Sequence, residues 1–175
     1  NSFIAIFTDD GTLDVQFQGS GVSSEPDDLA ISNVMFTSSG HILVAGKSTD
    51  DWYNYSVVRK FSMNGELDEG YGELGEVRIF LDPNLHIGNS IASELPNGGT
   101  LISGSVLRTI GLMTNHAFYV ALGPQGDLDP SFGVNGIMVD SVNTIVSSNS
   151  PGNCSLLDTE GRVLFGGQQP WNNGG

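Results

Sequence analysis

The hydrophobic positions of this chain fall in short runs of apolar, β-branched and aromatic residues, each bounded by turn-forming residues. Three of these runs lead into a turn that ends in glycine, at residues 1–7, 55–61 and 116–122. Runs of this length and composition predict β-strands followed by tight turns. The glycines that end the turns are Gly11, Gly65 and Gly126, and glycine adopts a positive φ there at the least cost.

Three further kinds of run predict the other strands. The strand after the turn is clearest at residues 76–80 and 136–140, whereas Pro26 interrupts its counterpart soon after Val22. A third strand is predicted at residues 30–36, 90–95 and 153–157. A fourth begins and ends with glycine each time, at residues 40–46, 98–104 and 161–167. Helical periodicity is absent throughout the sequence, so the pattern predicts an all-β fold built of antiparallel hairpins.

One motif occurs three times between these strands, at residues 11–22, 65–77 and 126–137. Each copy opens with Gly-x-Leu-Asp, continues with an aromatic residue three positions after the Asp, and has a glycine four positions later. We call this segment the Leu-Asp loop. Its leading glycines lie 54 and 61 residues apart, a spacing typical of propellers and solenoids. The repeated aromatic residues Phe17, Tyr71 and Phe132 are interpreted as wedges in the core between repeats.

Four antiparallel strands in about 58 residues make up one blade of a β-propeller. The strand from Gly40 to Gly46, the Arg59-Lys60-Phe61 segment and the Asn64-Gly65 start of the Leu-Asp loop together resemble the delta-60 repeat, also described as a β-propeller domain of unknown function. The resemblance covers all three repeats, although Gln18 stands where glycine is usual. It implies a propeller-type array in a bacterial secreted or surface protein, without assigned catalytic residues.

The phase of the repeats predicts incomplete blades at the two termini of a single domain, residues 1–175. Two complete blades are flanked by two half-blades, and three blades are fewer than the 4–8 that are typical of propellers. Unpaired strand edges associate with other chains, so we expect the halves to join in trans, as a ring or a head-to-tail filament. The expected assembly residues are Phe3, Ile4, Ile6, Phe7, Val163, Leu164, Phe165 and Trp171. The alternative is a piece of a longer propeller, and the start at Asn1 without a Met fits a processed chain or a fragment.

The composition of the chain argues against nucleic acids and membranes as partners. It has 6 Lys and Arg against 20 Asp and Glu, a net charge of −14. Such a chain cannot replace the counterions of a nucleic acid, and an anionic membrane surface is disfavoured for the same reason. No apolar run approaches the roughly 20 residues of a membrane-spanning helix, so membrane insertion is not expected. The single cysteine, Cys154, excludes an internal disulfide and a Cys-based zinc site.

Sites for metals and cofactors are weakly indicated. Asp14, Asp68 and Asp129 recur in register and are weak Ca²⁺ candidates, although an Asp in a turn more often accepts backbone N–H groups. The glycine pattern at residues 70–75 precedes a strand, whereas a dinucleotide site needs a helix there. The three histidines lack metal-ligand spacing. We therefore expect no cofactor and no enzyme activity; a glycosidase with paired carboxylates is a third-ranked reading.

Some residues suggest a role outside the cell. Trp52, Tyr53 and Tyr55 share one loop and, with Trp171, are candidates for stacking on a sugar. Two N-glycosylation sequons begin at Asn54 and Asn153. The sequence thus predicts an extracellular or cell-surface protein with a structural or adhesive role through binding copies of itself. A carbohydrate-binding propeller module that recognises surface glycans is the alternative.

Overall fold

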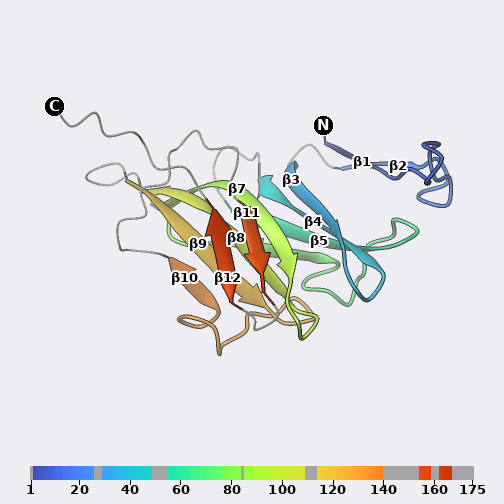
Figure 1. Cartoon of the computed structure of the whole chain (residues 1–175). Coiled ribbons are helices and arrows are strands. Elements are labelled where there is room, and N and C mark those ends of the chain that lie inside the picture. Colours follow the sequence, from blue (N-terminus) through green and yellow to red (C-terminus); the bar gives the residue numbers. More distant parts are fainter. Residues whose placement is uncertain are drawn as a thin grey trace.

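The computed structural model describes residues 2–25, 29–48, 55–83, 85–108, 114–139, 154–158 and 162–166 (Figure 1). These residues contain no helix and form twelve β-strands. The strands are β1 (Phe3–Ala5), β2 (Val22–Ser24), β3 (Leu29–Phe36), β4 (His41–Ser48), β5 (Ser56–Ser62), β6 (Glu76–Ile79), β7 (Leu85–Glu94), β8 (Thr100–Arg108), β9 (Thr114–Leu122), β10 (Ile137–Val139), β11 (Cys154–Leu157) and β12 (Val163–Gly166). The predicted all-β fold is confirmed.

The strands form four antiparallel sheets. The first sheet has the order β3-β4-β5-β6 and the second sheet the order β7-β8-β9-β10. Two further sheets have two strands each: β1 pairs with β2 in the N-terminal hairpin, and β11 pairs with β12 in the C-terminal hairpin. Neighbours in each sheet are consecutive in sequence, as expected from the glycine-containing turns between them.

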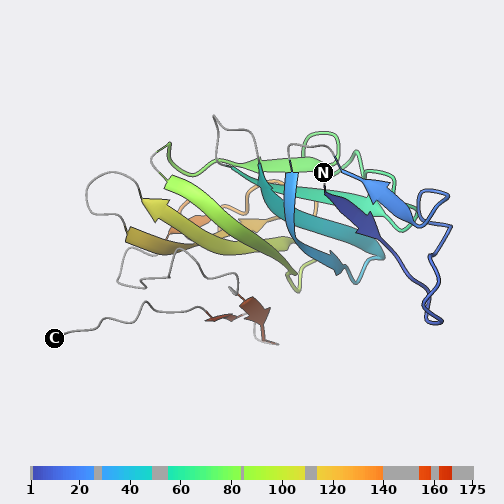
Figure 2. The same ribbon diagram turned by 90° about the horizontal axis from the view of Figure 1, so that it is seen from above.

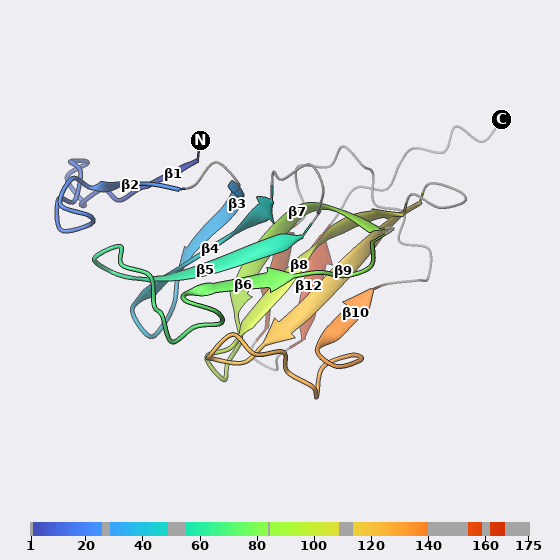
Figure 3. The ribbon, with the colours of Figure 1, turned by 180° about the vertical axis from the view of Figure 1, so that it is seen from behind.

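The two hairpins lie on opposite sides of the pair of four-stranded sheets (Figures 1 and 2). One core cluster joins the N-terminal hairpin to the first sheet through Ile4 and Phe17, which pack with Ile42, Val44 and other residues. A second cluster fills the space between the first and second sheets. The first sheet is therefore covered on both faces, which explains the nearly continuous burial of β4 and β5. Figure 3 shows the outer strands β6 and β10 from behind.

The inner strands β3 and β7 each carry a bulge, at neighbouring positions of the repeat. The register of β3 shifts between Ile31 and Asn33, and that of β7 shifts between Ile87 and Ser90. The bulge in β7 brings the buried Ser90 hydroxyl to the first sheet, where it donates to the carbonyl oxygen of Gly46 at 2.8 Å and lies 2.8 Å from the Ser56 hydroxyl. This bulge hides the alternation of polar and apolar residues, so the sequence predicts only the C-terminal part of β7.

The Leu-Asp loops are corners that close the outer hairpins. In each loop the backbone N–H of the Asp donates to a strand residue preceding the turn, as in Asp68 to the Lys60 oxygen at 2.9 Å. The aromatic residue then turns inward: Phe17 is 0% exposed and Tyr71 is 1% exposed. Phe17 packs in the cluster between the N-terminal hairpin and the first sheet, and Tyr71 in the cluster between the two large sheets. Both residues are wedges between neighbouring sheets, as the sequence predicts.

Candidate assembly interface

Equivalent strands of the repeats pair in the same register wherever both are present. In the first sheet β4 pairs with β5, and Ile42 lies opposite Phe61. In the second sheet β8 pairs with β9, and the equivalent Thr100 lies opposite Leu122. The repeat places β12 in the position of β4 and β8, and β1 in the position of β5 and β9. Within the described residues, however, β12 has only β11 as a neighbour and β1 has only β2.

The backbone of β1 presents one row of polar groups to its open edge. The Ile6 N–H donates to the Gly21 oxygen at 3.0 Å, and the Ile6 oxygen accepts from the Asp14 N–H at 2.9 Å. Ile6 is therefore turned toward the β2 side. Because alternate residues of a strand bond to opposite neighbours, Ala5 and Phe7 present their N–H and C=O groups to the open edge.

The same reasoning orients β12. The Arg162 oxygen accepts from the Asp158 N–H at 3.0 Å, so Arg162 faces the β11 side. Val163 and Phe165 alternate with it and present their backbone groups to the open edge. Each hairpin thus has an edge of the kind that pairs with another strand.

The predicted assembly residues divide by exposure. Phe7 is 61% exposed and Leu164 is 69% exposed, and Phe3 is also exposed. Ile4 is buried and Ile6 is partly buried against the same cluster, so these two residues hold the N-terminal hairpin to the first sheet. Val163 is partly buried, and Phe165 belongs to β12. Trp171 lies outside the described residues.

The repeated aspartates accept backbone N–H groups within their own loops. Asp14, Asp68 and Asp129 each accept, through Oδ1, from the N–H two residues later, at 3.0, 3.2 and 2.9 Å. The Ser131 hydroxyl also donates to Asp129, and these hydrogen bonds hold the pKa of the Asp129 carboxyl below its usual value. Among the described residues no three His, Cys, Asp or Glu side chains gather to hold a metal ion. The geometry favours the turn-stabilising interpretation of these aspartates over Ca²⁺ binding.

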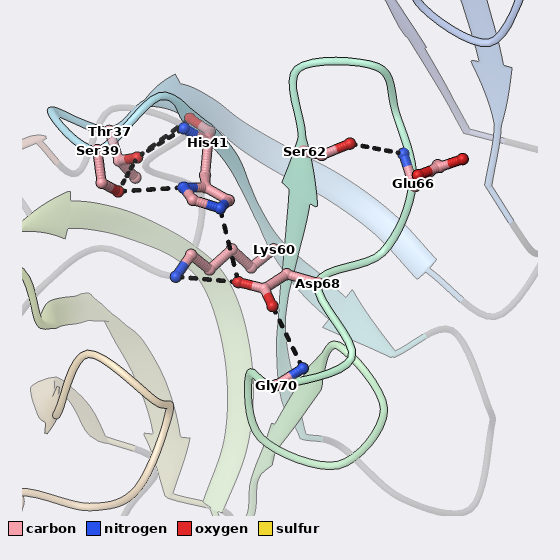
Figure 4. Close-up of polar contacts among 8 residues, drawn as sticks. All are labelled: Thr37, Ser39, His41, Lys60, Ser62, Glu66, Asp68 and Gly70. Carbon is pink, nitrogen blue, oxygen red and sulfur yellow. Dashed lines mark hydrogen bonds and ion pairs between the residues drawn. The ribbon is translucent and has the colours of Figure 1, made fainter.

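A polar network surrounds Asp68 (Figure 4). Lys60 Nζ lies 3.2 Å from Asp68 Oδ2, and His41 Nε2 lies 3.8 Å from the same oxygen. On its other side His41 Nδ1 is 3.1 Å from the Ser39 hydroxyl. The order Asp-His-Ser is that of a hydrolase triad, but the Asp–His distance exceeds a hydrogen bond, the Lys60 ammonium pairs with the carboxylate, and Ser39 is an exposed turn residue. The network joins the turn between β3 and β4 to the Leu-Asp loop.

A buried ion cluster that sequence reasoning missed fastens the N-terminal hairpin. Arg59 of β5 donates through Nη1 to Glu25 at 2.9 Å and through Nε to Glu76 at 2.6 Å. Arg78 also binds Glu76. Burial lowers the pKa of Arg59, but the hydrogen bonds to Glu76 and Glu25 outweigh it and raise the pKa overall. The available signal was an arginine within the β-prone run from Val57 to Phe61, because a buried guanidinium needs a carboxylate partner.

Two cavities adjoin these features. One of about 740 Å³ borders the Arg59 cluster and is lined by Glu73, Leu74 and Phe80 among others. Both of its guanidinium groups already bind carboxylates, so it is a poor site for an anion. A second cavity of about 330 Å³ lies between the second sheet and the C-terminal hairpin, where Phe132 and Val163 line it.

Of the three candidates for sugar stacking in one loop, only Tyr55 belongs to the described residues. Tyr55 is buried, and its ring lies 4.8 Å from that of Phe80 and 5.5 Å from the Arg78 guanidinium. This differs from the expectation of an accessible ring, because Tyr55 directly precedes β5 and begins the continuously buried stretch of residues 55–59. Trp52 and Tyr53 lie outside the described residues, as do the sequon residues Asn54 and Asn153.

The described residues contain no helix with the length and apolar character needed to span a membrane. In comparisons with protein-family models, curated proteins and solved structures, the chain matches none of them significantly.

Proposed function

We propose that this chain is a propeller-type repeat protein that assembles with copies of itself by completing a four-stranded blade between subunits. The observation that supports this proposal is the complementarity of the two open edges. The C-terminal hairpin has the position of the two inner strands of a blade, and the N-terminal hairpin has that of the two outer strands. One copy supplies what its neighbour lacks.

The in-chain pairs fix the register of the proposed joint. Ile42 lies opposite Phe61 and Val44 opposite Arg59 in the first sheet. Transferred to the equivalent positions, this register places Val163 opposite Phe7 and Phe165 opposite Ala5. These are the residues whose backbone groups face the open edges, so the transferred register pairs donors with acceptors without any slip. Leu164 then lies opposite Ile6 and becomes covered.

The joint is heterologous, since β12 of one copy contacts β1 of the next. Such joints form a ring if the rotation closes and a filament if it does not. Two copies together would supply about six blades, which is within the usual range of 4–8 for closed propellers. A cyclic dimer is therefore the smallest assembly in which every β1 pairs with a β12.

A proline substitution in β1 tests the proposal. Ala5→Pro removes an N–H that would bond to β12 of the neighbour, whereas the bond of Ile6 to β2 remains. We expect the wild-type chain to sediment as a dimer or a larger assembly and Ala5→Pro to sediment as a monomer. Ala5→Val is the matched control, since it keeps the N–H and suits a strand. Equal assembly of Ala5→Pro and Ala5→Val would contradict the proposal.

We also propose an extracellular or cell-surface location with a structural or adhesive role. Two observations support this location and role. The sequence resembles secreted repeat proteins, and the unpaired backbone groups of β1 and β12 suit assembly into a multi-subunit layer or fibre. Antibody labelling of intact cells tests it: labelling only after the cells are broken open would contradict this location.

A further inference from the structure

The Leu-Asp loop contacts the next repeat in the same way wherever that repeat is present in the chain. The residue after the wedge aromatic has a left-handed backbone, with φ of 52° at Gln18 and 58° at Gly72. Its N–H donates to the residue before the turn glycine of the following repeat: Gln18 to the Asn64 oxygen at 3.0 Å, and Gly72 to the Gln125 oxygen at 2.7 Å. The contact is therefore a property of the repeat.

The turn glycines at these contacts are tightly covered. A Cβ built on Gly65 would lie 2.7 Å from the Phe17 ring, and one built on Gly126 would lie 2.8 Å from the Gly72 nitrogen. The equivalent Gly11 has nothing within 4 Å of such a Cβ. Gly11 has the same backbone, with φ of 83°, so its turn has the shape of the other two without the loop that covers them.

The third Leu-Asp loop has the geometry for this contact, but its wedge is less covered than those of the other two loops. Gly133 has φ of 55°, like Gln18 and Gly72, so the loop already has the contact geometry. Its wedge, Phe132, is only half-buried, whereas the wedges of the other loops are 0% and 1% exposed. Phe132 and Val163 both line the 330 Å³ cavity. Val163 is equivalent in the repeat to Ile42, which packs in one cluster with Phe17, and to Thr100, whose hydroxyl accepts from the Tyr71 hydroxyl.

We infer that Phe132 and Gly133 of one subunit dock on the turn at Asp10 and Gly11 of the next subunit. This inference rests on the proposed assembly and adds a second contact to the strand joint. The Gly133 N–H donates to the Asp10 carbonyl oxygen, and the Phe132 ring covers Gly11. Within one chain the two parts lie apart: the third loop is at the end of the second sheet, between β9 and β10, and the N-terminal hairpin lies beyond the first sheet (Figure 1).

Two substitutions at opposite ends of the chain test this contact. Phe132→Ala removes the wedge, and we expect it to weaken assembly by at least about tenfold, as for an aromatic anchor at the centre of an interface. Its control is Val134→Ala in the same loop, because Val134 is highly exposed. Gly11→Asn places a side chain where the docked loop would lie, and Asn tolerates the left-handed backbone. Its control is Gly40→Asn, at another open hairpin turn with φ of 75°.

The readout is the concentration at which half of the subunits are assembled, measured by sedimentation, with circular dichroism to verify that each variant is folded. Weakening by Phe132→Ala and Gly11→Asn, with both controls near wild type, supports the contact. Assembly of the wild type with no effect of Gly11→Asn overturns the contact and leaves the strand joint standing. A wild type that stays monomeric overturns the proposed function and the contact together.

Discussion

At the residue scale, the wedge Tyr71 shows how one side chain couples two sheets. Its ring is buried between the first and second sheets, and its hydroxyl donates to the Thr100 hydroxyl at 3.3 Å. Lys60 Nζ lies 5.3 Å from the centre of the ring. Phe17, at the equivalent position, has no hydroxyl and is equally buried. An aromatic ring therefore packs between the sheets at this position without the hydrogen bond that Tyr71 makes.

Tyr71→Phe tests the environment of this residue. Burial raises the pKa of the Tyr71 hydroxyl to about 12, partly offset by the hydrogen bond to Thr100. A tyrosine in the unfolded chain ionises near 10, so the folded state holds this proton more tightly and the wild type loses stability as the pH rises from 10 to 12. We expect Tyr71→Phe to cost about 1 kcal/mol at neutral pH and to remove this alkaline loss. Urea unfolding at pH 7 and at pH 11 measures both effects, and an unchanged alkaline slope would contradict the burial.

Glu76→Gln tests the buried ion cluster. Burial raises the pKa of Glu76, but hydrogen bonds to Arg78 and Arg59 outweigh it, so the pKa lies below 4.5. A lowered pKa stabilises the fold above the unfolded value of 4.5, and this stabilisation is lost as the pH falls through the folded value. We expect Glu76→Gln to be about 2 kcal/mol less stable at pH 7, with a smaller difference from wild type at pH 3. Thermal unfolding at both pH values measures this, and a difference that grows in acid would refute it.

At the scale of elements, the repeated turns and loops and the strand β3 were predictable, whereas the N-terminal part of the bulged strand β7 was not. Glycine-containing turns and the Leu-Asp motif depend on local backbone conformation, so three copies in register placed most of the strands. The extra length of β7 depends on a bulge and on the contact of Ser90 with the first sheet. The Glu25–Arg59–Glu76 cluster likewise joins residues of three strands or their ends, which local patterns do not show.

Ser90→Ala tests the bulge as a link between sheets. The buried Ser90 hydroxyl donates to the Gly46 oxygen and contacts the Ser56 hydroxyl, so its removal leaves buried polar groups without this partner. We expect a loss of about 1–3 kcal/mol in the free energy of unfolding. Ser39→Ala, at an exposed turn, is the control and should cost less than about 0.5 kcal/mol. Equal losses for the two variants would show that the bulge does not link the sheets.

At the scale of the whole molecule, the two four-stranded sheets lie between two hairpins, in which β1 and β12 each lack a second neighbouring strand within the described residues. The candidate interface was predictable in outline, because the repeat phase identifies the terminal halves. The roles within it were not: Ile4 faces the core, whereas Phe7 and Leu164 are exposed, and only the structure separates them. The central claim is that the open edges pair between copies.

Sedimentation velocity of the purified 175-residue chain over a wide range of concentrations tests this claim most directly. We predict a concentration-dependent shift from the 18.5 kDa monomer to a cyclic dimer or a longer head-to-tail assembly. Ala5→Pro should abolish the shift. A wild-type chain that remains an 18.5 kDa monomer at every concentration would contradict the account.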